Sequence, residues 1–264
     1  MTKRSRKRKR QAGRRQPHFD LLYGRQAVRE ALRAGRRSFH TLYLVGGMKS
    51  SSLLVEIEKI ARETGAAVET VERQQLDEWL GGVNHQGVAL KAGFYPYAHL
   101  DETLALARTR GQDPLLLLLD QIQDPQNLGT LLRTAEACGV HGVVLPRHRA
   151  AAVTPAVVNA SAGAVEHLLV CQETNLVTTI RALQAEGLWI AGLEAHPDAQ
   201  PLGSVDLRGP LGVVVGSEGY GLSRLVGETC DWLVELPMAG RINSLNAAVA
   251  GSILLFDVAR QRQG

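Results

Sequence analysis

Leu115-Leu116-Leu117-Leu118-Leu119-Asp120 is the stretch of sequence that decides the fold class. It holds five leucines without interruption and ends on a carboxylate. An apolar run of this kind is typical of a central parallel strand, because helices cover both faces of such a strand. The run therefore predicts an α/β domain with a parallel sheet, which we place at residues 114–264.

Apolar runs follow the leucines at intervals that leave room for helices. We predict further strands at residues 142–145, 167–170, 189–193, 211–215 and 232–236, with helical segments between most of them. Gly139 and Gly187 stand where glycine commonly ends a helix. In open sheets of this type, ligands bind beyond the carboxyl ends of the strands. We therefore look for functional residues directly after the predicted strands.

The chain before the leucine run alternates in the same way and predicts a smaller α/β domain at residues 18–95. Its expected elements are helices at 26–34 and 52–64 and strands at 41–45, 67–71 and 88–92. Residues 96–113 contain proline and mixed polar residues around one short helical segment, so we expect the connection between the domains there.

The composition suits a globular protein, since 45% of the 264 residues are hydrophobic. No apolar run approaches the roughly 20 residues that span a bilayer, and the N-terminus lacks the apolar stretch of a secretory signal. We therefore expect a cytoplasmic protein without a membrane contact. Cys138, Cys171 and Cys230 are widely separated, and we interpret them as buried thiols. No His, Cys and carboxylate cluster has ligand spacing, so no metal is expected.

Residues 1–17 form a basic tail that carries nine Lys or Arg and no acid, whereas the rest of the chain has a net charge of −5. A flexible arm of this kind suits a nucleic-acid backbone, because binding releases counterions from the phosphates. The alternative is a solubilising or ribosome-adhering tail without a defined site. A mitochondrial presequence fits less well, because the tail has almost no apolar positions for an amphipathic face.

The first segment that carries chemistry runs from Asp120 to Ala135 and joins a strand end to a helix start. Asn127 stands at the helix entry, where free backbone N–H groups and its own amide can meet a polar ligand. Arg133 lies further along the helix on a polar position. A purely structural alternative is a surface ion pair between Arg133 and Glu136.

The second segment, residues 213–222, places glycines directly after a predicted strand, which lets the backbone approach a ligand closely. The glycine spacing does not match a dinucleotide-binding fingerprint, and no Gly-Lys-Ser or Gly-Lys-Thr of a phosphate-binding loop occurs. What remains is a glycine loop that presents one carboxylate, Glu218. A simple turn would account for the segment equally well.

The third segment, residues 236–247, leads into an alanine-rich helix that we expect to run to about Arg262. Ser244 is a candidate N-cap of this helix, and Asn246 would then lie in its first turn. Small residues after Asn246 permit close packing of another chain segment. Capping and packing would be a sufficient account of this segment taken alone.

Together, in this order and at these separations, the three segments resemble the signature motifs of the SpoU branch of the SPOUT RNA methyltransferases. Residues 22–32 and 85–88 are in turn similar to the substrate-binding domain that precedes the catalytic domain in many such enzymes. With both domains present, the likeness is greatest to bacterial enzymes that methylate a guanosine in 23S ribosomal RNA. One departure is that Ala247 and Ala248 replace a more typical Val-Ser pair, which affects helix packing more than chemistry.

The resemblance implies an α/β-knot fold, in which a small α/β substrate-binding domain precedes a catalytic domain with a C-terminal trefoil knot. It further implies S-adenosylmethionine as methyl donor, transfer to a ribose 2'-hydroxyl, and a homodimer with the active site at its interface. By motif position, the residues expected to line the cofactor pocket are Gly216, Gly219, Leu236, Met238 and Leu245. Those expected to face the reacting ribose are Asn127, Arg133, Glu218, Ser244 and Asn246.

Two other functions remain open from the sequence. Transfer RNA is an alternative substrate, although the extra N-terminal domain disfavours it because tRNA enzymes of this branch often lack that domain. A catalytically silent protein that binds ribosomal RNA or assists ribosome assembly is the other, and the joint presence of the five ribose-facing residues argues against it.

Overall fold

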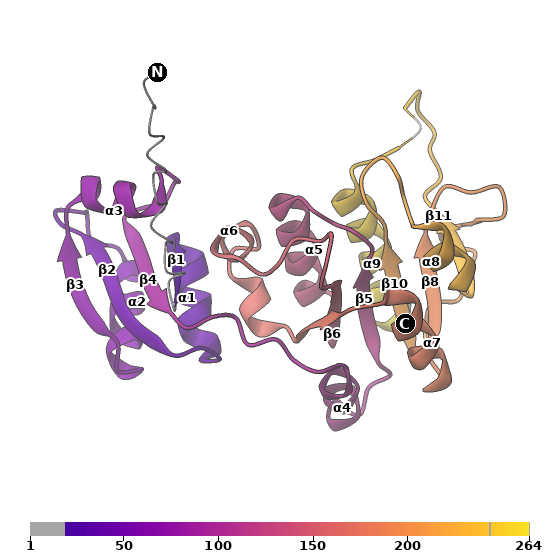
Figure 1. The fold of residues 1–264 in the computed structure, drawn as a ribbon, viewed down its shortest axis with the longest axis horizontal. Coiled ribbons are helices and arrows are strands. Elements are labelled where there is room, and N and C mark those ends of the chain that lie inside the picture. The colour runs from indigo at the N-terminus through magenta and orange to yellow at the C-terminus, as the bar shows by residue number, and fades with distance from the viewer. Residues whose placement is uncertain (1–18, 243, 264) are drawn as a thin grey trace, which may run out of the picture.

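A computed structural model describes residues 19–242 and 244–263, so the basic tail at 1–17 lies outside the described residues. Figure 1 shows two lobes side by side, a smaller one from the first part of the chain and a larger one from the rest. The sheet of the larger lobe has seven strands, and all its neighbouring strands are parallel. The α/β class predicted from the leucine run is therefore confirmed.

The smaller lobe is a mixed sheet with helices packed on it. Its elements are β1 (Asp20–Tyr23), α1 (Arg25–Ala34), β2 (Phe39–Val45), α2 (Ser52–Glu63), β3 (Ala67–Val71), α3 (Arg73–Leu80) and β4 (Val88–Ala92). The strand order is β1-β4-β2-β3, and only β2 and β3 run parallel. Helix α1 is amphipathic and buries Ala27, Val28, Ala31 and Leu32, whose spacing places them on one helix face.

The larger lobe is a parallel sheet flanked by helices. Its elements are β5 (Leu115–Leu119), α5 (Pro125–Ala137), β6 (Gly142–Pro146), α6 (Pro155–Ala160), the 3-10 helix η1 (Ala164–His167), β7 (Val170–Glu173), α7 (Leu176–Ala185), β8 (Trp189–Leu193), β9 (Gln200–Pro201), β10 (Leu211–Val215), α8 (Arg224–Thr229), β11 (Trp232–Glu235) and α9 (Ala247–Gln263). The strand order is β7-β6-β5-β10-β8-β11-β9. Strands β5 and β10 are buried along their whole length, which explains their unbroken apolar sequences.

The segment between the two lobes is docked on the larger one. It carries α4 (Leu100–Arg110), which lies at the bottom of Figure 1. Thr103, Leu104 and Ala107 of this helix are buried. A side chain at Gly142 of β6 would overlap Thr103, so glycine at this position lets α4 lie close to the sheet.

One predicted strand is displaced in the structure. The run at 167–170 does not begin a strand at His167, because residues 164–167 form η1 and the strand starts at Val170. The reason is that Glu166 and His167 make contacts with the smaller lobe. Gly139 and Gly187 adopt φ values of 72° and 88°, which confirms both as helix ends in the left-handed region.

The three cysteine thiols are less uniform than predicted. Cys171 is buried, whereas Cys138 and Cys230 are only half-buried. Burial raises the pKa of all three thiols, and the pKa of Cys171 and of Cys230 reaches about 12. The prediction of three buried thiols is therefore right for Cys171 and wrong in degree for the other two.

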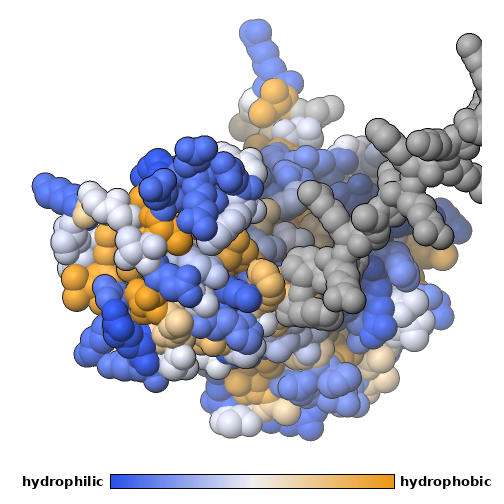
Figure 2. Space-filling model, turned by 60° about the vertical axis from the view of Figure 1, so that its left-hand side comes forward, coloured by the Kyte–Doolittle hydropathy of each residue, from blue (hydrophilic) through white to orange (hydrophobic). Residues whose placement is uncertain are grey.

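The largest of three apolar clusters extends through both lobes and includes residues of α1, β4, α5 and η1. On the face where the smaller lobe comes forward, Figure 2 shows mostly hydrophilic residues with apolar ones scattered among them. None of the helices in the described part of the chain has the length and hydrophobicity to cross a membrane.

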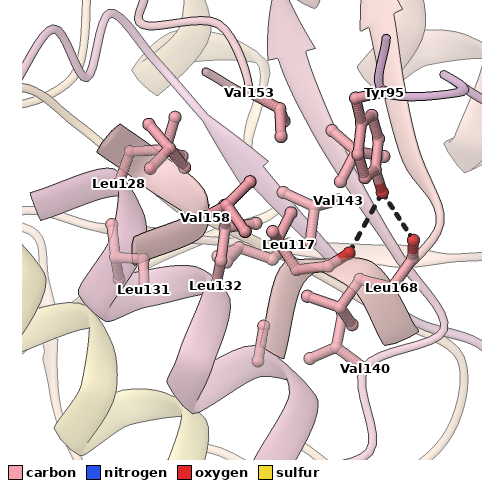
Figure 3. Packing of buried hydrophobic residues seen from close by; sticks show 14 of the residues in the cluster. Tyr95, Leu117, Leu128, Leu131, Leu132, Val140, Val143, Val153, Val158 and Leu168 are labelled. Carbon is pink, nitrogen blue, oxygen red and sulfur yellow. Dashed lines mark hydrogen bonds between the residues drawn. The ribbon is translucent and has the colours of Figure 1, made fainter. Parts of the chain in front are cut away.

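Tyr95 is a polar member of this core (Figure 3). Its hydroxyl lies 2.7 Å from the carbonyl oxygen of Leu168 and 3.2 Å from that of Val165. Only 5% of Tyr95 is exposed, and burial raises the pKa of its phenol to about 12. The neutral phenol is therefore strongly preferred in the folded chain.

We expect Tyr95 to make the fold sensitive to alkali. An unfolded tyrosine ionises near pH 10, so the free energy of unfolding falls as the pH rises from 10 towards 12, by about 2 to 3 kcal/mol for this residue alone. Urea unfolding at pH 9 and at pH 11.5 measures the loss, and Tyr95→Phe removes this part of it. An equal loss in the wild type and in Tyr95→Phe would contradict the assignment.

Candidate active site

A cavity of about 900 Å³ opens at the carboxyl ends of β8, β10 and β11. Three loops contribute to its walls, with residues 194–195, 216–221, and 236–242 together with 244–246, and they lie at the upper right of Figure 1. The predicted site residues that line the cavity are Gly216, Glu218, Gly219, Leu236, Met238, Ser244, Leu245 and Asn246. Asn127 and Arg133 are the two predicted site residues that do not line it.

The glycine loop after β10 folds back tightly on itself. Ser217 and Gly221 exchange two backbone hydrogen bonds of 3.0 Å. A side chain at Gly216 would overlap the carbonyl group of Gly221, and Gly219 and Gly221 have φ values of 79° and 64°. Each of these conditions favours glycine, because only glycine combines a missing Cβ with an unstrained left-handed backbone. The result is a cavity wall made largely of exposed backbone.

Two carboxylates hold the far end of this loop. Glu194, directly after β8, accepts a hydrogen bond of 2.6 Å from the backbone N–H of Leu222. Asp120, at the end of the leucine run, accepts one of 2.6 Å from the backbone N–H of Ser223. Glu194 is not among the site residues predicted from the sequence. Its position directly after a predicted strand is the signal that could have indicated it.

Asn246 brings the three chemistry-bearing segments together. Its side-chain N–H₂ group donates to Asn127 Oδ1 at 3.0 Å and also to Glu218 Oε1. Its Oδ1 atom accepts from the backbone N–H groups of Ala248 and Val249, at 3.0 and 3.1 Å. One amide therefore connects the helix after β5, the glycine loop and the start of α9.

These contacts correct the predicted capping of the last helix. Asn246 precedes the first residue of α9 and satisfies the free N–H groups of its first turn, so Asn246 is the N-cap and Ser244 is not. Ser244 lies before the cap in the cavity wall and is exposed. Because α9 begins only at Ala247, the Ser244 side chain does not cap the helix and is free to face a ligand.

The two predicted residues on α5 lie in different surroundings. Asn127 is 8% exposed, in the first turn of a helix that Asp124 caps through the backbone N–H of Gln126 at 3.1 Å. Arg133 is exposed on the same helix, outside the cavity. In the part of the chain that the structure describes, Arg133 has no carboxylate within 4.0 Å, so the alternative of a pair with Glu136 is not formed.

The cavity lining has an excess of negative charge. Three carboxylates line it, those of Glu194, Glu218 and Glu235, against one guanidinium, that of Arg241. No group of three or more His, Cys, Asp or Glu residues within 19–242 and 244–263 is arranged to hold a metal ion. The charge of the lining suits a ligand with a net positive charge.

The model of the SpoU rRNA methylase family matches residues 114–256, which is more than half of the chain. The chain belongs to this family. A second family model, described as RNA 2'-O ribose methyltransferase substrate binding, matches residues 21–98. The protein is thus an S-adenosylmethionine-dependent RNA methyltransferase with a substrate-binding domain before its catalytic domain.

Known proteins resemble the chain over nearly its full length. YacO of Bacillus subtilis, whose name places it provisionally in the TrmH family of tRNA/rRNA methyltransferases, is 38% identical over 243 residues, 92% of this chain and 96% of that protein. The crystal structure of the SpoU methyltransferase AviRb from Streptomyces viridochromogenes with AdoMet has a TM-score of 0.74 at 25% identity and covers 92% of this chain and 90% of that one. A structure described as giving insight into methylation of C/U34 on tRNA has a TM-score of 0.51 at 27% identity and covers 56% of this chain and 96% of its own.

The residues of the cavity fit S-adenosylmethionine. This cofactor carries a sulfonium, an ammonium and a carboxylate, so its net charge is positive and opposite to that of the lining. Side chains at Gly216 or Gly221 would overlap the loop itself or Glu194, so glycine at these positions keeps the loop in its place at the cavity. When bound, the cofactor supplies an electrophilic methyl group.

We expect Glu194 to act on cofactor binding through the glycine loop. Glu194→Ala removes the acceptor for the Leu222 N–H group and should weaken S-adenosylmethionine binding by about tenfold, roughly one charge-assisted hydrogen bond. Glu194→Gln keeps a side-chain oxygen at the same place and should bind within about threefold of the wild type.

Isothermal titration of both variants with S-adenosylmethionine measures this effect. If Glu194→Gln binds as weakly as Glu194→Ala, the negative charge acts on the cofactor itself and the positioning role is wrong. Circular dichroism of the two variants serves as the control for folding.

Proposed function

We propose that the protein transfers a methyl group from S-adenosylmethionine to a ribose 2'-hydroxyl, at a guanosine of large-subunit (23S) ribosomal RNA, in the cytoplasm. The observation that carries the proposal is the contact of Asn246 with both Asn127 and Glu218 at the cofactor cavity. Polar groups from three distant segments converge there, beside a site for a methyl donor. Such convergence is what a group-transfer site requires.

The reaction needs the ribose oxygen in line with the methyl group and a partner for the charge that develops on that oxygen. We assign to Asn127, Ser244 and Asn246 the hydrogen bonds that orient the ribose. We assign to Glu218 the positioning of Arg133 or of the ribose. Arg133 stabilises the developing alkoxide or anchors a neighbouring phosphate. A guanidinium suits this role better than that of a base, because it offers a positive charge and N–H donors but no acceptor for a proton.

A homodimer is part of the proposal, because Arg133 lies outside the cavity of its own chain. Helix α5, which carries Arg133, packs on α9 through a hydrogen bond of 2.8 Å between Thr134 and Ser252. Val249, Ile253 and Phe256 form an exposed apolar stripe on α9. A second copy packed on this stripe would cover its apolar surface and carry an Arg133 to the neighbouring cavity.

Ribosomal RNA is favoured over transfer RNA by the presence of the substrate-binding domain. The structure concerned with tRNA C/U34 covers only 56% of this chain. The alternative of a catalytically silent RNA-binding protein does not hold, because the chain belongs to a family of RNA methyltransferases.

Transfer of radiolabelled methyl to unmodified 23S ribosomal RNA and to bulk transfer RNA tests the proposal. Mapping of alkali-resistant linkages then locates the modified ribose. Label at a single guanosine of 23S RNA is the expected result. Label on transfer RNA alone would identify transfer RNA as the substrate, and absence of label from both RNAs would contradict the assignment to 23S RNA.

A further inference from the structure

The two lobes meet along a close interface that the sequence did not reveal. In the smaller lobe it involves β1 and α1, and in the larger lobe α6 and η1. The Asn159 side chain donates to the carbonyl oxygen of Tyr23 at 3.1 Å. Side chains at Gly24 or Gly163 would overlap residues of the opposite lobe, so the backbones approach closely at both places.

A buried ion network lies at the centre of this interface. The guanidinium of Arg37, in the smaller lobe, donates to both oxygens of Glu166 in η1, at 3.0 and 2.7 Å. It also donates to Asp20 at 2.7 Å and to the carbonyl oxygen of Gly93 at 3.2 Å. The side chains of Arg37 and Glu166 are both 0% exposed. A buried charge without its partner is strongly unfavourable, so this pair holds only when the lobes are docked in one orientation.

Neighbouring contacts fix the same orientation. Arg36 donates to the carbonyl oxygens of Leu168 and, at 3.2 Å, of Pro96, while the Tyr95 hydroxyl lies at hydrogen-bond distance from the carbonyl oxygen of Leu168 (Figure 3). At the edge, Glu30 and His167 lie 3.0 Å apart. These contacts join the smaller lobe to the chain on both sides of η1 and leave little freedom for rotation.

The segment from α6 to η1, which contacts the smaller lobe, also packs on α5, the helix that carries Asn127 and Arg133. A side chain at Gly129 of α5 would overlap Ala160 and Ser161, so α5 and the end of α6 are in intimate contact. Gly129 lies between Asn127 and Arg133 on that helix. The segment from α6 to η1 is therefore a spacer between the substrate-binding domain and α5.

We propose that Arg37 is a positioning residue, which through Glu166 fixes the substrate-binding domain relative to α5 and so sets where bound RNA meets the reacting ribose site. The inference rests on the proposed function, because it concerns how RNA reaches that site. It assigns Arg37 and Glu166 no contact with RNA or cofactor. Its direct consequence is that these residues govern the KM for RNA and not the chemical step.

The test compares the wild type with the double variant Arg37→Met, Glu166→Leu, which removes the two fully buried charges together, while the Asp20 side chain is 15% exposed and keeps contact with water. We expect the KM for 23S RNA to rise at least tenfold, with kcat and the Kd of S-adenosylmethionine within twofold of the wild type. Small-angle scattering of the full chain should show a larger maximum dimension. Arg62→Ala is the matched control, because Arg62 pairs with Glu58 inside the smaller lobe and should leave all four quantities unchanged.

Arg36→Met serves if the double variant does not fold, since Arg36 is only half-buried, and it should raise the KM for RNA about threefold. An unchanged KM would overturn the proposal, as would a parallel rise in the Kd of S-adenosylmethionine, which would indicate a general loss of structure. Failure of the proposed function is distinguishable, because then the wild type itself transfers no methyl group to 23S RNA. In that case, an unchanged scattering profile of the double variant would still contradict the proposal that Arg37 and Glu166 fix the orientation of the substrate-binding domain.

Discussion

Replacing Arg133 with alanine is expected to lower kcat by about 100- to 1000-fold, because the developing negative charge on the ribose oxygen loses its cationic partner. The Kd of S-adenosylmethionine should change less than twofold, since Arg133 does not line the cavity of its own chain. Arg133→Lys keeps the positive charge but lacks the planar set of N–H donors of a guanidinium, so it should recover only part of the rate of methyl transfer. Single-turnover methyl transfer and titration calorimetry measure the two quantities separately. Near-normal turnover of Arg133→Ala would remove Arg133 from the mechanism.

Mixed dimers test whether Arg133 acts across the subunit interface. A dimer of one Arg133→Ala chain and one Asn246→Ala chain contains one complete site if each site takes its arginine from the partner. It contains none if each chain builds its own site. Activity of the mixed dimer near half that of the wild type is expected, with each parental variant almost inactive. An inactive mixed dimer would place Arg133 and Asn246 in the same chain's site.

Replacing Gly216 with valine should weaken S-adenosylmethionine binding by at least about 100-fold. The added side chain would occupy the space of the Gly221 carbonyl and push the glycine loop out of its fold. Loss of the tight loop also displaces Glu218, so methyl transfer should fall with binding. Overpacking at such a contact is costly because neither backbone segment can yield cheaply.

Gly240→Ala is the matched control for this variant. Gly240 lines the same cavity, but a Cβ there meets no atom within 4 Å, so binding should stay within about twofold of the wild type. Titration calorimetry compares the two variants directly. Equal binding by both would mean that the glycine loop is not part of the cofactor site.

The strands were the most predictable part of the fold, because each is a local apolar run. The strands at 189–193 and 211–215 were placed to the residue. The displaced start of β7 at Val170 has a different cause, since Glu166 and His167 contact residues about 130 positions away in the chain. A local sequence pattern carries no record of such partners.

The candidate site also has a part that the sequence predicted and a part that it did not. The resemblance indicated the three segments, and the cavity brings eight of their ten residues together. The N-cap was misplaced because Ser244 and Asn246 are both good capping residues, and only the start of α9 decides between them. Glu194 was missed because its partner is a backbone N–H group of another loop, which leaves no trace in side-chain spacing.

The charge of the cavity lining has a consequence for turnover. A bound S-adenosylmethionine would lie beside Glu218 and Glu235 in a lining that has a single guanidinium, that of Arg241. The demethylated product has no sulfonium charge and would lose part of this electrostatic attraction. We therefore expect the cavity to bind the product more weakly than the methyl donor, which would limit inhibition by accumulated product.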